Sequence, residues 1–323
     1  MTGIKHVLFR ILKSEITLIS IERTVIVLNI RTWIYVSLVI ILWSLSAAVE
    51  AVTLRSLTPM EFCAWGTTFG SLSLFIIIIS TGRMNTIHSY SFRDHLRLLL
   101  FSMLGFAGYQ TLKYTAFTMV PIPQANILQY TYPIFIVIFA LPVLNQKLTI
   151  SKTVGITMGF IGAAIILSGG SLVTLNRMYL NGYLIALGAG ASFGLFSVLA
   201  SQAAFEPVSS MFFMQVYSAL VMVSILVFKG LLAFPSGINE IAGVFYAGVM
   251  GHVVGVMLLI AAQRSTNDVS YISGTLYLIP FLSLFAFKLF LNFPIPLYAF
   301  TGLVFIVGGM VIHTTISNRR QID

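Results

Sequence analysis

The amino-acid sequence predicts an all-α polytopic membrane protein with ten transmembrane helices, arranged as two inverted five-helix repeats. The composition is that of a chain surrounded by lipid, since 58% of residues are hydrophobic, only 8% are charged and the mean hydropathy is +0.98. Residues that fix backbone geometry also recur 147 positions apart, as Tyr130 and Tyr277, Pro133 and Pro280, Asn145 and Asn292, Gly155 and Gly302, and Gly162 and Gly309. Such punctuation residues are what a duplicated structural unit retains.

Apolar runs long enough to cross a hydrocarbon core of about 30 Å, which takes about 20 helical residues, begin near Trp33 and continue almost to the end of the chain. The ten expected spans are 33–54, 60–80, 95–116, 122–143, 151–171, 180–201, 209–230, 240–262, 269–290 and 296–316. The short connections between them contain helix breakers such as Thr58-Pro59 and Glu206-Pro207. We therefore expect no soluble domain between the spans.

The repeat predicts an inversion, because Pro133 lies in the fourth span and Pro280 in the ninth. Five helices separate these positions, so the two units cross the membrane in opposite senses. An inverted repeat gives a chain two nearly equivalent packings, one open to each side of the membrane. The sequence therefore indicates alternating access to a central site.

Four segments are expected along the chain: a basic, amphipathic cytoplasmic segment at 1–31, the first five-helix repeat at 32–171, the second at 178–316 and a cytoplasmic tail at 317–323. With the N-terminus in the cytoplasm, 13 Lys and Arg residues fall inside and 5 outside, including Lys113. This asymmetry follows the positive-inside rule and predicts an inner-membrane protein with both termini cytoplasmic. A disordered N-terminal tail is the alternative to an amphipathic one.

The run Asn-Ile-Leu-Gln-Tyr-Thr-Tyr-Pro at 126–133, the later Gly155 and Gly162, and Leu42-Trp43-Ser44 in the first span resemble the EamA-type branch of the drug/metabolite transporter superfamily. The resemblance covers residues 33–316. It implies ten helices in two inverted units, and export or uptake of small metabolites such as amino acids and related amphiphiles. The chain departs from the family pattern at Gln146, where a glutamate is usual, and at Trp65, where many relatives have an arginine.

Pro133 and Pro280 are expected to kink the fourth and ninth helices, because proline removes one helix hydrogen bond and clashes with the carbonyl four residues before it. The freed carbonyl groups must face protein or a wet cavity rather than lipid. A purely structural kink and a hinge beside a ligand site are both compatible with this pattern.

Polar and aromatic side chains share one face of each kinked helix. Asn126, Tyr130 and Pro133 lie at i, i+4 and i+7 in the fourth span, and Ser273, Tyr277 and Pro280 repeat the pattern in the ninth. Paired tyrosines suit an amphipathic ligand with an aromatic, aliphatic or cationic part. Hydrogen bonding between helices is the alternative reading.

Two titratable residues inside the spans are candidates for function, because Glu50 is the only carboxylate away from the span edges and His252 lies in the middle of its span. Glu50, one turn from the outer end of the first helix, is a candidate counter-ion for a ligand ammonium or a carrier of a coupling proton, with a snorkelling helix-end residue as the alternative. His252, in the eighth span, is a candidate proton-exchanging or ligand-binding residue, with a packing role as the alternative. The full predicted ligand site comprises Trp43, Glu50, Tyr109, Gln110, Asn126, Tyr130, Phe193, His252, Ser273 and Tyr277.

Other function classes lack their signatures. The sequence has no Walker A loop, no G-x-S-x-G elbow, no H-E-x-x-H pair and a single cysteine, Cys63. We therefore expect no enzyme, no metal or cofactor and no nucleic-acid partner. The prediction is a secondary active transporter of a small metabolite in contact with membrane lipids, monomeric or homodimeric, with protons as a candidate coupling ion. A lipid-handling or scaffold membrane protein is the alternative.

Overall fold

The structure, a computed structural model, describes residues 30–145, 147, 149–168, 177–265, 272, 275–276 and 278–319. All regular elements in these residues are helical, and six of the helices are long and apolar enough to cross a membrane, with three shorter apolar helices beside them. The predicted fold class is thereby confirmed. The expected amphipathic segment falls outside the described residues except for Ile30 and Arg31, as do residues 320–323 of the tail.

The first unit contains five spans, of which the third and fourth are interrupted. Its elements are α2 (Ile30–Thr53), α3 (Pro59–Ser80), the short α4 (Met84–Ile87), α5 (Phe92–Ser102), the π-helix η1 (Met103–Gly108), α6 (Tyr109–Met119), α7 (Ile122–Gln129), α8 (Tyr132–Val143) and α9 (Ile150–Leu167). The third span is therefore α5-η1-α6, and the fourth is α7-α8.

The second unit repeats this plan. Its elements are a single 3-10 turn, η2 (Arg177–Tyr179), followed by α10 (Leu180–Ser201), α11 (Pro207–Phe228), α12 (Ile238–Phe245), the π-helix η3 (Tyr246–Val254), α13 (Gly255–Arg264), α15 (Ile279–Leu291) and α16 (Leu297–Arg319). The eighth span, α12-η3-α13, thus carries a π-helical segment in the same place as the third.

Local sequence explains where several spans begin. Thr58 and Ser91 cap α3 and α5 through capping boxes with Glu61 and Asp94, and Glu206 accepts a hydrogen bond from the backbone N–H of Ser209 at the start of α11. Pro59 and Pro207 occupy first helical turns, where their missing N–H is not needed.

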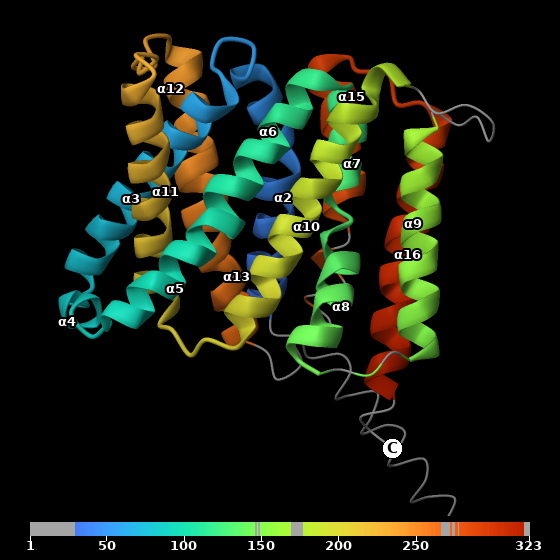
Figure 1. Ribbon diagram of the computed structural model, residues 1–323, viewed down its shortest axis with the longest axis horizontal. Coiled ribbons are helices and arrows are strands. Elements are labelled where there is room, and N and C mark those ends of the chain that lie inside the picture. Colours follow the sequence, from blue (N-terminus) through green and yellow to red (C-terminus); the bar gives the residue numbers. More distant parts are fainter. Residues whose placement is uncertain are drawn as a thin grey trace, which may run out of the picture.

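The two units exchange their first helices. Helix α2 of the first unit packs against α13 and α15 of the second, and α10 of the second unit packs against α6, α7 and α8 of the first. The second helices α3 and α11 pair with each other, as do the fifth helices α9 and α16, which stand side by side in Figure 1. Each unit therefore completes its packing only with the other.

The π-helical segments offer their carbonyl groups to these exchanged helices. A π-helix bonds five residues ahead instead of four, which disturbs the local pairing of backbone groups. Ser192 Oγ of α10 donates to the carbonyl of Leu104 in η1 at 2.7 Å, and Trp43 Nε1 of α2 donates to the carbonyl of Gly251 in η3 at 2.9 Å. Leu104 and Gly251 are 147 positions apart, so the repeat extends to these backbone contacts.

The fourth span is broken, rather than only bent, at its proline. Helix α7 ends at Gln129 and α8 begins at Tyr132, one residue before Pro133, so the missing N–H falls in a first turn. Helix α15 begins in the same way at Ile279, one residue before Pro280. A Cβ atom at Gly190 of α10 would lie 3.1 Å from the Gln129 carbonyl oxygen, so this glycine allows the close approach at the break.

The repeat is also visible at the far end of these helices. Asn145 and Asn292 are the two non-glycine residues with positive φ in the described parts of the chain, at 51° and 52°. Asparagine adopts this left-handed conformation more readily than most residues. The predicted correspondence of the two asparagines is therefore a correspondence of backbone conformation.

Glycines bring α9 and α16 together. A Cβ atom at Gly302 would lie 2.7 Å from the Gly162 carbonyl oxygen, and one at Gly309 would lie 2.6 Å from that of Gly155. The sequence repeat relates Gly155 to Gly302 and Gly162 to Gly309. In the helix contact each glycine meets a member of the other pair, so Gly162 faces Gly302 and Gly155 faces Gly309. Small residues of this kind let membrane helices approach closely.

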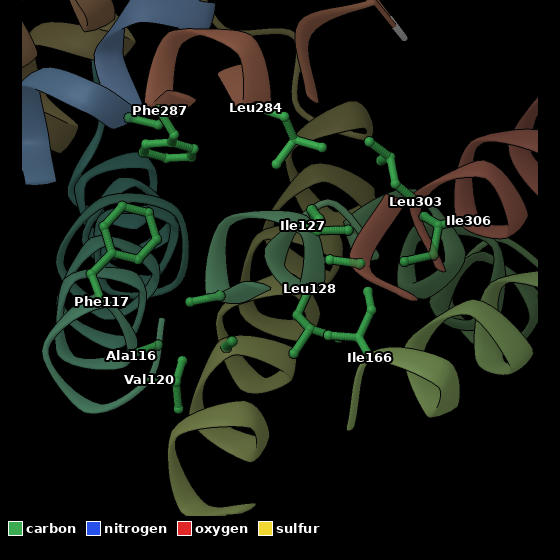
Figure 2. Close-up of a cluster of buried hydrophobic side chains, with 14 of the residues drawn as sticks. Ala116, Phe117, Val120, Ile127, Leu128, Ile166, Leu284, Phe287, Leu303 and Ile306 are labelled. Carbon is green, nitrogen blue, oxygen red and sulfur yellow. The ribbon is translucent and has the colours of Figure 1, made fainter. Parts of the chain in front are cut away.

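The largest buried apolar cluster lies at one end of the molecule, towards the carboxyl ends of α2, α6, α9 and α15. Figure 2 shows Ile127 and Leu128 of α7 directed into it beside Ile166, Leu284 and Ile306. The same end is at the top of Figure 1. We call this group, whose buried members run from Ala47 to Met310, the end cluster.

Candidate functional site

The break between α7 and α8 places two tyrosines among aromatic side chains of other helices. The ring centroids of Tyr130 and Tyr132 are 6.2 Å apart, and Tyr132 lies 5.0 Å from Phe193 of α10. Phe193 lies in turn 4.9 Å from Tyr109 of α6. All four side chains are half-buried, so the two units contribute to one partly accessible aromatic surface. We call these four residues the aromatic surface.

A buried ion pair lies one helical turn beyond Tyr109. Lys113 Nζ of α6 is 2.8 Å from each carboxylate oxygen of Glu50 on α2. The side chains are only 9% and 4% exposed. Glu50 is therefore no snorkelling helix-end residue in this structure, because its charge is met by a lysine from another span.

Gln110 and His252 continue this polar group. Gln110 Nε2 lies 3.3 Å from His252 Nε2, so the amide donates and the ring nitrogen accepts. The Tyr114 hydroxyl lies 3.5 Å from both Glu50 Oε1 and Gln110 Oε1. The predicted residues Glu50, Gln110 and His252 thus meet through contacts on three different spans.

Trp43 is held beside His252 by its bond to the η3 backbone. Its indole N–H donates to the carbonyl of Gly251, the residue next to His252. Trp43 and Tyr130 both pack against a buried cluster that includes Val36 and Ile279. Helix α2 and the break between α7 and α8 thereby contact the same group of apolar residues.

Asn126 belongs to a chain of hydrogen bonds beside the end cluster. Tyr109 donates to Gln129 Oε1 at 2.8 Å, Gln129 Nε2 donates to Asn126 Oδ1 at 2.7 Å, and Asn126 Nδ2 donates to Ser283 Oγ at 2.9 Å. This chain joins the third, fourth and ninth spans. Asn126, on the polar face predicted for the fourth span, therefore forms hydrogen bonds between helices, while the Tyr130 side chain is half-buried.

Eight of the predicted site residues can be placed, and contacts connect most of them. Tyr109 and Phe193 share the aromatic surface with Tyr130, while Glu50 and Gln110 belong to the polar group with His252. Trp43 and Asn126 are joined to them through Gly251 and Gln129. Ser273 and Tyr277 lie outside the described residues, as does Gln146.

Four further polar residues belong to this region although the sequence did not single them out: Lys113, Gln129, Tyr132 and Ser283. The charge count placed Lys113 with the outer charges, whereas the structure buries it in α6. Its signal was present in the sequence, because Lys113 and Glu50 are opposite charges near the same end of two spans. Opposite charges inside a membrane segment tend to pair.

The arrangement suits binding of an organic molecule. No group of three or more metal-ligating side chains occurs in the part of the chain that the structure describes. The aromatic surface offers ring faces to an apolar or cationic part, and the polar group offers charge and hydrogen bonds to a polar part. Sites for small molecules commonly combine a mostly apolar lining with a few convergent polar groups.

Comparisons with known proteins identify the family of the chain. A model of the EamA-like transporter family matches the chain twice, at residues 31–168 and 180–315. The uncharacterized transporters YoaV and YvbV of Bacillus subtilis (strain 168) are 23% and 22% identical to it over 290 and 299 residues. These alignments cover 88% and 90% of this chain, and 97% and 94% of the relatives.

A solved crystal structure shares the fold, with a TM-score of 0.63 at 19% identity, over 89% of this chain and 98% of the other. The two family matches each cover one five-helix unit, and together they span most of the molecule. This chain, a multi-pass membrane protein and not an enzyme, belongs to the EamA-like transporter family.

Proposed function

We propose that the protein is a secondary active transporter that moves a small polar or amphipathic metabolite, an amino acid or a related compound, across the inner membrane by alternating access. The observation that carries this proposal is the exchange of first helices between two units whose fourth and ninth spans begin anew at equivalent prolines. Repeat-related interruptions around a shared site are how inverted-repeat carriers change the side to which the site opens.

The distribution of burial supports one access state. At the end cluster, residues of α7 such as Ala125, Ile127 and Leu128 are fully buried. In α8, beyond the break, only Ile134 and Ala140 are buried. Helix α7 is thus more tightly packed than α8, which fits a site that is closed on the side of the end cluster. With both termini in the cytoplasm, as the charge count predicts, the α8 side faces the cytoplasm.

The experiment is counterflow in proteoliposomes with a panel of small metabolites. We expect exchange of at least one amino acid or related compound, and a loss of at least tenfold in Tyr130→Ala, because this side chain belongs to the aromatic surface. Phe285→Ala is the matched control, since it truncates an aromatic ring that is 63% exposed on α15. It should exchange at the wild-type rate.

Lipid scrambling in the same vesicles without exchange of any solute would contradict the proposal and favour a lipid-handling protein. Equal exchange rates for Tyr130→Ala and wild type would show that the aromatic surface does not bind the transported molecule. Tyr277→Ala, at the repeat-related position, is expected to lose exchange as well.

A further inference from the structure

The buried ion pair is placed where a transported molecule would meet it. Lys113 follows Tyr109 by one turn of α6, so its side chain lies at the end of the aromatic surface nearest the end cluster. Nζ lies 4.7 Å from the ring centroid of Tyr114, 5.8 Å from that of Tyr109 and 5.9 Å from that of Phe117. The ammonium is thus surrounded by aromatic rings and one carboxylate.

This environment makes the partner of Lys113 exchangeable. Ring faces attract the ammonium but carry no charge, so Glu50 supplies the negative charge that balances it. Removing one member of a buried pair without replacement costs several kcal/mol, whereas another carboxylate at the same place would restore the balance. A second carboxylate can therefore take the place of Glu50 only if Glu50 becomes neutral.

Other titratable groups lie close enough to interact electrostatically with the pair. They are Tyr109, Tyr114, Tyr130, Tyr246, Cys63 and His252. The tyrosine and cysteine side chains are already protonated near neutral pH, and His252 contacts Gln110 rather than Lys113. Glu50 is therefore the group among them whose protonation frees Lys113 for a second carboxylate.

We propose that Lys113 binds a carboxylate group of the transported molecule and that Glu50 carries the proton that accompanies it. The inference rests on the proposed function and adds to it a class of substrate and a coupling ion. The incoming carboxylate replaces Glu50 beside Lys113, and Glu50 takes one proton from the aqueous side to which the site is open. For a monocarboxylate the site keeps its net charge, and one proton crosses with each carboxylate. On the other side the substrate leaves, the proton leaves Glu50, and the ion pair forms again.

The test uses four probes that share one branched alkyl chain in proteoliposomes: 4-methylpentanoate, L-leucine, L-leucinamide and 3-methylbutylamine. The first two carry a carboxylate and the last two do not. We expect counterflow of the two carboxylates at rates at least tenfold above those of the amide and the amine. A pH-sensitive dye inside the vesicles should report one proton for each L-leucine that enters, because L-leucine, unlike the free acid of 4-methylpentanoate, does not cross the bilayer without the protein.

Variants separate binding from folding. Glu50→Gln mimics the protonated carboxyl group but cannot release a proton, so any carboxylate flux through this variant should no longer respond to a pH gradient. Two double variants leave no buried charge without its opposite. They are the neutral pair Glu50→Gln with Lys113→Met and the reversed pair Glu50→Lys with Lys113→Glu. Both should stay folded, as judged by size-exclusion chromatography. Both should lose carboxylate exchange. Lys288→Met, at an exposed position of α15, is the control and should behave as wild type.

Retention of carboxylate exchange by the neutral pair would overturn the inference, and so would equal transport of the amine and the acid, although the protein would remain a transporter. A pH gradient that still drives flux in Glu50→Gln would remove Glu50 as the proton carrier. If wild type moves none of the four probes and no member of the wider metabolite panel, the proposed function is overturned together with the inference.

Discussion

The third span of the first unit and the eighth span of the second have the same backbone and different side chains. Both contain a π-helical segment, η1 or η3, whose carbonyl group accepts a hydrogen bond from the first helix of the other unit. Yet α6 carries Tyr109, Gln110, Lys113 and Tyr114, whereas the positions 147 residues later in α13 are Val256, Met257, Ile260 and Ala261.

This difference separates two requirements of a carrier. The backbone is symmetric because two access states of similar free energy need two units that can take each other's packing. The side chains are asymmetric because one ligand site needs one set of charges. Substitutions in symmetric features should therefore have matched effects in the two units, and substitutions in the polar group should not.

The largest expected difference is between Lys113→Met and Ile260→Met, at repeat-related positions. Lys113→Met leaves the buried Glu50 without its counter-charge, which should destabilise the fold by about 3–5 kcal/mol. Ile260→Met keeps an apolar side chain of similar volume and should cost less than about 1.5 kcal/mol. Unfolding in detergent, followed by circular dichroism, measures both, and equal losses would contradict the asymmetry.

The glycine contact between α9 and α16 should respond equally from either side. A Cβ atom at Gly162 would lie 2.5 Å from the Gly302 carbonyl oxygen, and one at Gly309 would lie 2.6 Å from that of Gly155. Each alanine substitution should therefore cost about 1–3 kcal/mol through overpacking. Gly188→Ala on α10, where no atom lies within 4 Å of the new methyl group, is the control and should leave the midpoint unchanged or raise it.

The hydrogen bonds to the π-helical carbonyl groups should also contribute equally. Ser192→Ala and Trp43→Phe each remove a donor from Leu104 or Gly251, for an expected loss of about 1–2 kcal/mol. Ser46→Ala is the control, because Ser46 donates to Leu42 of its own helix. A loss confined to Trp43→Phe would show that only η3 depends on its partner helix.

The smallest effects are expected at Asn145 and Asn292. Both have φ near 50°, so alanine should destabilise either position by about 0.5–1 kcal/mol, whereas glycine should be tolerated. Paired thermal melts of the two alanine and two glycine variants measure this. If alanine lowers the melting temperature at only one of the two asparagines, the structural repeat does not extend beyond the helices to these residues.

The sequence predicted the features that depend on single residues with a fixed backbone preference. Pro133, Pro280 and the two asparagines mark helix ends that the structure places at equivalent positions. The η segments were not predicted, because a π-helix depends on hydrogen-bond register and has no distinctive residue pattern in these segments.

Prediction of the site was uneven for a related reason. Polar residues in apolar spans mark the region, so Glu50, Gln110 and His252 could be named from sequence. The pairing of Glu50 with Lys113 was missed, because Lys113 lies near a helix end and was counted with the charges that report orientation. Only the packing of α2 against the third span decides that the lysine points inward.

The exchange of first helices also constrains how the protein is made. Helix α2 enters the membrane before any other described helix, but its neighbours α13 and α15 are synthesised more than 200 residues later. Until then Thr32 and Ser44, two of its buried polar residues, lack the contacts with Ser265 and Ile279 that the finished protein gives them. The membrane insertion machinery, or α6 with its Lys113, must shelter the Glu50 carboxylate while the second unit is still being translated.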